Sequence, residues 1–143
     1  MEKERYKESK RRDIMKIHCF RLKRGQDLLL SIKEYLLEKH IKAGTILSAV
    51  GCVSKARIRD ASGVTIRELM EPLEIVSLMG TVSESRSHLH VAFSKEDLST
   101  VGGHLVEGCI INTTGEIVIM ELEEYSFHGE YDAETGYDEL IIK

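Results

Sequence analysis

The sequence predicts an α+β fold, with a mainly antiparallel β-sheet and one prominent helix. Only the segment Leu28 to Ile41 repeats apolar residues at helical spacing. The remainder is a succession of short β-like runs separated by turn residues, which is typical of antiparallel strands. At 143 residues the chain can build one ordinary hydrophobic core, so we expect a single domain.

The first expected elements are a strand and the helix. Ile14 to Leu22 has a partial alternation of apolar residues, which favours a strand. Turn residues follow at Arg24 to Asp27, where an acidic residue suits the N-terminus of a helix. A cationic last turn and Gly44 then mark the end of the helix. His40 is therefore better interpreted as a helix-end residue than as a ligand.

From Thr45 onward the pattern predicts strands joined by turns. We expect Gly51 to break one strand run and Asn112 to Gly115 to form a hairpin turn. The expected strands are Thr45–Val50, Val53–Asp60, Val64–Leu69, Leu73–Met79, Ser87–Phe93, His104–Ile111, Glu116–Leu122, Tyr125–Tyr131 and Tyr137–Ile142.

Charge is unevenly distributed along the chain. Residues 1–24 carry ten basic and four acidic residues, a net charge of +6, whereas residues 25–143 carry ten basic and twenty acidic residues, a net charge of −10. We expect residues 1–12 to form a basic, flexible leader before a domain at residues 13–143. An acidic body disfavours nucleic acid as the main partner, because binding to duplex DNA requires a basic face. Contact between the leader and phosphate is the weaker alternative to a solvated tail.

The cysteines and the hydropathy of the chain indicate the cellular compartment in which the protein is expected. No apolar run approaches the ~20 residues that span a bilayer, and the first residues lack the apolar segment of a secretory signal. The three cysteines, Cys19, Cys52 and Cys109, are far apart and form no CxxC motif. This pattern predicts reduced, mostly buried thiols in a cytoplasmic protein that does not cross a membrane.

A cluster of histidines is the strongest functional signal. His88, His90 and His104 lie within eighteen residues of one another. On a strand, His88 and His90 share one face and lie roughly 6.5–7 Å apart. A third imidazole, from a neighbouring strand after a Gly-Gly turn, would complete a three-nitrogen metal site with one open coordination position. Zn²⁺ suits such ligands best, although Ni²⁺, Cu²⁺, Co²⁺ and Fe²⁺ also accept imidazole.

The alternative is that these histidines are exposed or hydrogen-bonded residues on a sheet face. The apolar Leu89 and Val91 favour a site, because they can pack in the core while the imidazoles face a cleft. Gly102 and Gly103 allow unusual dihedral angles or a close backbone approach just before His104.

The reaction, if there is one, stays open at this level. A three-histidine zinc site with bound water supports hydrolysis or hydration, but the sequence places no carboxylate at an obvious spacing for acid–base catalysis. Glu84, Arg86 and Ser87 are candidates for binding an anionic group near the metal, and Glu107 is expected to face away from it. His18 and His128 are expected to be structural.

An ordered set of motifs resembles the plants and prokaryotes conserved (PPC) domain. The resemblance extends from about Ile14 to Ile142. The motifs are Arg24–Leu28, where the helix begins, Gly44–Gly51, Glu74–Gly80, Ser87-His-Leu-His90 and Gly102–Gly108. The resemblance implies an α+β fold assembled as a homotrimer. Prokaryotic members of the family that contain three histidines look like zinc-binding proteins. The histidine motif matches His88, His90 and His104, so the resemblance implies that these three residues are zinc ligands.

The resemblance leaves two functional hypotheses. The first is a metal site that acts on, or senses, a small molecule. The second is a non-enzymatic oligomeric module that recruits other proteins, or DNA through its basic leader. In plants the domain follows AT-hook segments of nuclear DNA-binding proteins, but this chain contains no Arg-Gly-Arg-Pro hook. A DNA-binding role therefore rests on the plant relatives and on the leader alone.

Overall fold

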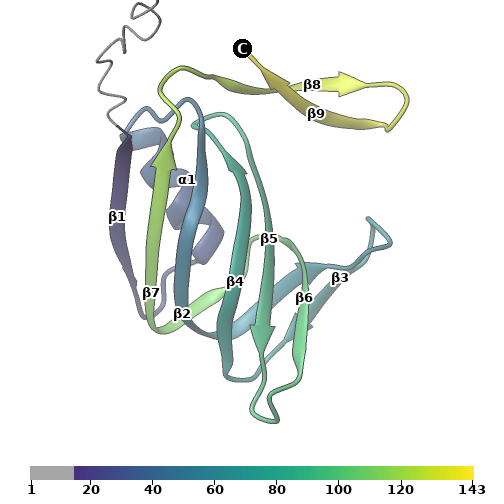
Figure 1. The fold of residues 1–143 in the computed structure, drawn as a ribbon. Coiled ribbons are helices and arrows are strands. Elements are labelled where there is room, and N and C mark those ends of the chain that lie inside the picture. Colours follow the sequence, from purple (N-terminus) through teal and green to yellow (C-terminus); the bar gives the residue numbers. More distant parts are fainter. Residues whose placement is uncertain (1–14) are drawn as a thin grey trace, which may run out of the picture.

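The structure, a computed structural model, describes residues 15–143 as a curved sheet, one helix and a C-terminal hairpin (Figure 1). The expected α+β class and single helix are confirmed, whereas the leader at residues 1–12 lies outside the described residues. The elements are β1 (Lys16–Lys23), α1 (Leu28–Glu38), β2 (Gly44–Arg59), β3 (Ile66–Leu69), β4 (Leu73–Val82), β5 (Ser87–Ser94), β6 (Thr100–Leu105), β7 (Ile110–Glu121), β8 (Phe127–Asp132) and β9 (Tyr137–Ile142).

The sheet curls around the long strand β2, which pairs with β7 and β4 along its first part and with β6 at its last residues. Its strand order is β1-β7-β2-β4-β5-β6, with β3 paired to β2. The last residues of β2 also pair with β6, which places Ile58 opposite Leu105 and Arg59 opposite His104. Strands β2, β4, β5 and β6 therefore form a closed circuit. This closure brings the end of β2 beside the histidine strands.

The core lies between the sheet and helix α1, which covers one face of the sheet (Figure 1). Asp27 caps the helix, since its Oδ1 accepts a hydrogen bond of 3.0 Å from the Leu30 amide. Its Oδ2 accepts a second hydrogen bond of 2.7 Å from the Gly108 amide. One carboxylate thus joins the start of the helix to the loop before β7. The buried helix residues are Leu28, Leu29, Ile32 and Leu36.

Two predicted strand breaks are wrong. Strand β2 continues through Gly51, which adopts a φ of +141° and sits so close to β7 that a Cβ would lie 2.0 Å from the Thr114 carbonyl oxygen. Strand β7 continues through Asn112 to Gly115, because it pairs with β1 on one side and with β2 on the other. Long-range pairing outweighs the local turn preference of these residues.

The predicted strand from His104 to Ile111 is also wrong. Strand β6 ends at Leu105, and a turn that contains Gly108 at a φ of +108° precedes β7. His104 consequently lies at the end of β6. The interpretation of His40 is confirmed: it follows helix α1 with a φ of 53°, and its amide donates to the Leu37 carbonyl.

The expectation of mostly buried thiols is wrong for two of the three cysteines. Cys19 is exposed and Cys52 is partly exposed, because both lie on strand faces that the core does not cover. Cys109 is fully buried and packs in the core. Burial raises the pKa of the Cys109 thiol to about 11. None of the three forms a disulfide.

We expect iodoacetamide at neutral pH to modify Cys19 first and Cys109 only after unfolding. The raised pKa alone leaves Cys109 about 100-fold less thiolate than an ordinary cysteine, and burial blocks access as well. Mass spectrometry of a labelling time course, with and without denaturant, measures the order. Rapid labelling of Cys109 in the folded protein would contradict its place in the core.

Among residues 15–143, no helix combines the length and hydropathy needed to cross a membrane.

Candidate metal centre

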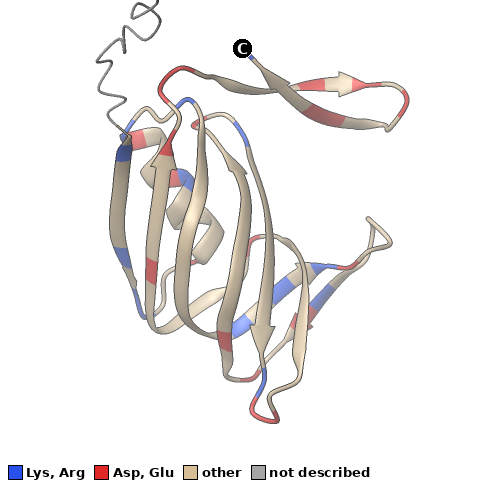
Figure 2. Cartoon of the chain, in the orientation of Figure 1, with Lys and Arg blue, Asp and Glu red and all other residues tan. Residues whose placement is uncertain are grey.

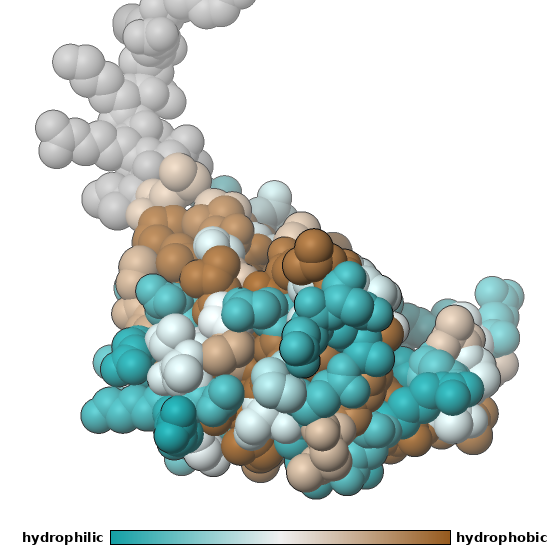
Figure 3. Space-filling view, turned by 90° about the horizontal axis from the view of Figure 1, so that it is seen from below, coloured by the Kyte–Doolittle hydropathy of each residue, from teal (hydrophilic) through white to brown (hydrophobic). Residues whose placement is uncertain are grey.

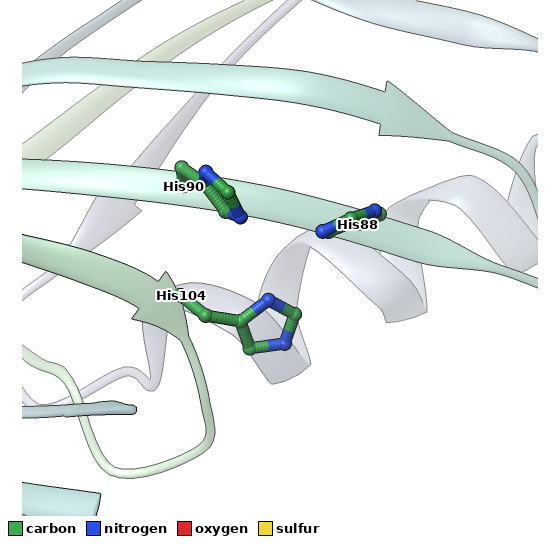
Figure 4. A group of neighbouring side chains, drawn as sticks. All are labelled: His88, His90 and His104. Carbon is green, nitrogen blue, oxygen red and sulfur yellow. The ribbon is translucent and has the colours of Figure 1, made fainter. Parts of the chain in front are cut away.

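His88, His90 and His104 come together on the outer face of the sheet, away from the core (Figure 4). On β5, His88 and His90 are exposed and alternate with Leu89 and Val91, which are only 1% and 3% exposed. His104 lies directly opposite His90 in the pairing of β5 with β6. The alternation and the pairing together place all three imidazoles on one face.

The three rings surround a common space, and Figure 4 shows ring nitrogens turned toward it. Their centroids are 5.1 to 5.7 Å apart, and one ligand atom from each ring lies within 4.8 Å of the others. Two nitrogens bound to one tetrahedral zinc lie roughly 3.4 Å apart. A small inward movement of the rings therefore suffices to reach metal-binding geometry.

The protonation of the cluster suits metal binding. Burial, followed by the positive charges of Arg59, His88 and His90, lowers the pKa of His104 to about 4. Burial, followed by the charges of His90 and Arg86, also lowers the pKa of His88. Both rings are therefore neutral at pH 7, the state in which imidazole binds a metal. Moreover, His104 Nδ1 is buried and has no hydrogen-bond partner, which is compatible with a role as a metal ligand.

Gly102 and Gly103 confirm the expected close backbone approach, although they lie within β6 and form no turn. A Cβ on Gly103 would lie 2.5 Å from the Arg59 carbonyl oxygen, and one on Gly102 would lie 2.6 Å from that of Val91. Neither position can accept a side chain without moving a neighbouring strand. The two glycines thus allow β6 to pack between β2 and β5, next to His104.

The candidate anion-binding residues of the sequence divide into two groups. Arg86 and Ser87 line a cavity of about 390 Å³ together with His88 and His104. Glu84 does not line this cavity, and its carboxylate lies 3.4 Å from His40 Nδ1. Glu107 stays outside the histidine cluster, as expected.

Sequence reasoning missed four residues that line the same cavity, namely Arg59, Tyr137, Asp138 and Glu139. Arg59 alternates with Ile58 along β2, which indicates a strand face, but only the pairing of β2 with β6 places it beside His104. Asp138 and Glu139 belong to β9, and no spacing in the sequence indicates where that hairpin packs.

The two remaining strand histidines, His18 and His128, lie outside the cluster. His18 is buried, with Nε2 2.6 Å from a Glu121 carboxylate oxygen and Nδ1 3.2 Å from the Tyr35 hydroxyl. His128 lies on β8 with Nε2 3.2 Å from the Ser126 hydroxyl. Neither contributes to the cluster.

Comparison with known proteins identifies the family. The family model of the Plants and Prokaryotes Conserved (PCC) domain matches residues 9–123. The chain belongs to this family. The resemblance to the PPC domain is therefore confirmed, and the match ends before the β8–β9 hairpin.

Among curated proteins, the chain is similar to the bifunctional protein GlmU from two Synechococcus strains. Identity to each is 40% over 129 residues, or 90% of this chain. The chain spans only about a fifth of the length of these relatives (21% and 20%).

Solved structures share the fold. A hypothetical protein from Salmonella is 31% identical with a TM-score of 0.87, over 90% of this chain and 94% of the other. The metal-containing protein AF0104 from Archaeoglobus fulgidus is 35% identical with a TM-score of 0.74, over 88% and 93%. A candidate DNA-binding protein from Bacteroides thetaiotaomicron, at 22% identity and a TM-score of 0.79 over 89% and 95%, shows likeness of fold alone.

We expect Gly80→Ala to destabilise the fold and disturb the histidine strand. Gly80 on β4 has a φ of +150°, and a Cβ there would lie 1.9 Å from the His88 carbonyl oxygen. Backbone strain of this kind costs roughly 1–3 kcal/mol, and the clash adds to it. Denaturant unfolding measures the loss. The matched control is Gly136→Ala, where φ is +77° but no atom lies within 4 Å. Equal losses in the two variants would show that the contact with His88 is unimportant.

Proposed function

We propose that this PPC-domain protein binds a divalent metal, zinc in the first place, through His88, His90 and His104. The observation that carries the proposal is that one ligand atom from each of the three imidazoles lies within 4.8 Å of the others. The lowered pKa of His88 and of His104 and the unpartnered His104 Nδ1 support it. So does the similarity to the metal-containing A. fulgidus protein, at 35% identity.

The site is suited to a small molecule. Three imidazoles leave one position of a tetrahedral zinc free, and the cavity of about 390 Å³ lies beside the histidines. When bound, zinc supplies a Lewis acid that lowers the pKa of a bound water. Metal-dependent chemistry or small-molecule binding therefore both fit the site. Imidazole also binds Ni²⁺, Cu²⁺, Co²⁺ and Fe²⁺, so the metal must be identified by analysis.

Untagged protein purified without chelator should contain close to one zinc per chain, and His104→Ala should contain almost none. Loss of a direct ligand should weaken the affinity by more than the roughly 10- to 100-fold that loss of a second-shell partner costs. Elemental analysis measures the metal. The matched control is His128→Ala, which removes an exposed histidine outside the cluster. Protein that stays metal-free after zinc has been offered would end the proposal.

The second part of the proposal is that the chain assembles as a homotrimer. The family resemblance suggests a trimer. Exposed apolar side chains on the outer face of the sheet also support this proposal. Leu47, Val50, Val76 and Met79 are 50 to 60% exposed. Met79 lies opposite His90 in the β4–β5 pairing, so this apolar face adjoins the metal site. Figure 3 shows hydrophobic surface exposed between hydrophilic side chains. Apolar surface of this kind favours contact with another protein surface.

The mass in solution should be three times the 16.2 kDa of one chain. Val76→Lys should shift the population toward single chains, because it places a charge on the apolar face. Light scattering after size-exclusion chromatography measures the mass. Leu37→Lys is the control, since Leu37 is equally exposed (59%) but lies on helix α1. A wild-type mass of one chain would refute the trimer. If the protein is a non-enzymatic interaction module, His104→Ala should leave the assembly and its partners unaffected.

DNA binding is the less supported alternative. Residues 25–143 carry a net charge of −10, which repels phosphate, and the basic residues 1–12 lie outside the described part of the chain. The three free cysteines support a reducing, cytoplasmic location.

A further inference from the structure

Three buried polar atoms in the described part of the chain lack a hydrogen-bond partner, and all three belong to residues that line one cavity. They are Arg59 Nε, Ser87 Oγ and His104 Nδ1. Buried polar groups are almost always hydrogen-bonded, and an exception often indicates a missing ion or ligand. The proposed metal accounts for His104 Nδ1, and the other two, Arg59 Nε and Ser87 Oγ, point to a second ligand in the cavity of about 390 Å³ that their residues line.

The unpartnered groups are mainly donors. Arg59 Nε can only donate, and it lies beside the histidine cluster because Arg59 pairs with His104 across β2 and β6. Ser87 begins β5, and its hydroxyl can donate as well. Arg86 lines the same cavity, and its one hydrogen bond there is a long one of 3.4 Å to the Asp138 carbonyl. Two guanidinium groups and a hydroxyl match the oxygens of a carboxylate or a phosphate.

Acidic residues of the C-terminal hairpin also line the cavity. Figure 2 shows basic residues near the end of β2 and acidic residues on β8 and β9. Asp138 and Glu139 line the cavity, and Glu139 Oε1 accepts a hydrogen bond of 2.9 Å from the Thr135 hydroxyl. The two negative charges of Asp138 and Glu139 offset the two positive charges of Arg59 and Arg86. A divalent metal held by the histidines would add positive charge beside the cavity, which favours an anion.

We infer that this cavity binds a small oxyanion, a phosphate or carboxylate group, through Arg59, Arg86 and Ser87 beside the three histidines. The inference rests on the proposed metal site, because His88 and His104 line the same cavity. It adds the chemical class of the ligand and the residues that recognise it. Because Asp138 and Glu139 repel negative charge, we expect the ligand to direct its anionic group toward Arg59 and Arg86.

The test is calorimetric titration of zinc-loaded protein with inorganic phosphate and, separately, with acetate. The two probes distinguish a phosphate site from a carboxylate site. Arg59→Gln should weaken binding of the preferred anion roughly 10- to 150-fold, the range expected for loss of one charge-assisted hydrogen bond. Ser87→Ala should also weaken it. The control is Arg21→Gln, on strand β1 at the opposite end of the strand order, which should bind as wild type does.

Zinc content and circular dichroism of the same samples separate this inference from the metal proposal. A folded Arg59→Gln variant that keeps its zinc and loses the anion supports the inference. If neither anion binds to zinc-loaded wild-type protein, the oxyanion inference is wrong, although the metal proposal still holds. The same conclusion follows if Arg59→Gln and Arg21→Gln bind the anion equally well. If the protein cannot hold zinc but still binds an anion in a way that depends on Arg59, the oxyanion inference holds and the metal proposal is wrong. Should Arg59→Gln fail to fold, Ser87→Ala decides in the same way.

Discussion

The close contact of β6 with its two neighbouring strands is the constraint on which the site depends. Gly103 faces the Arg59 carbonyl and Gly102 faces that of Val91, at distances that leave no room for a Cβ. Because of this contact the end of β2 pairs with β6, and Arg59 lies opposite His104. Pairing with β5 alone places His104 opposite His90, whereas the additional pairing with β2 brings Arg59 to the three histidines.

The alternation of side chains along β5 connects the site to the stability of the fold. Leu89, Val91 and Phe93 are buried in the core, so a shift of one residue in the register would expose them and bury the histidines. The burial of these apolar residues therefore also holds His88 and His90 on the outer face.

Much of the fold was predictable because its signals are local. The helical spacing from Leu28, the capping residue Asp27 and the alternation around His88 each depend on a few consecutive residues, and each was interpreted correctly. The errors arose where distant pairing decides the structure. Asn112 to Gly115 has the composition of a turn, yet it lies within β7, where Thr114 and Gly115 pair with β1 and Gly115 also pairs with β2. Gly51 and Gly102 appear as breaks in the sequence, whereas in the fold they are the places where strands approach most closely.

The candidate site shows the same division. The three histidines and the neighbouring Arg86 and Ser87 lie close together in the sequence, so their association could be predicted. Arg59 and the β9 carboxylates reach the cavity only through the closure of the sheet and the packing of the hairpin. This matters for the choice between a binding site and an enzyme. A metal-bound water needs a group that accepts its proton. The carboxylates that line the cavity, Asp138 and Glu139, lie on a hairpin beyond the residues that the family model matches. The three histidines are the candidate metal ligands, and the carboxylates of β9 are the candidates for accepting a proton next to them.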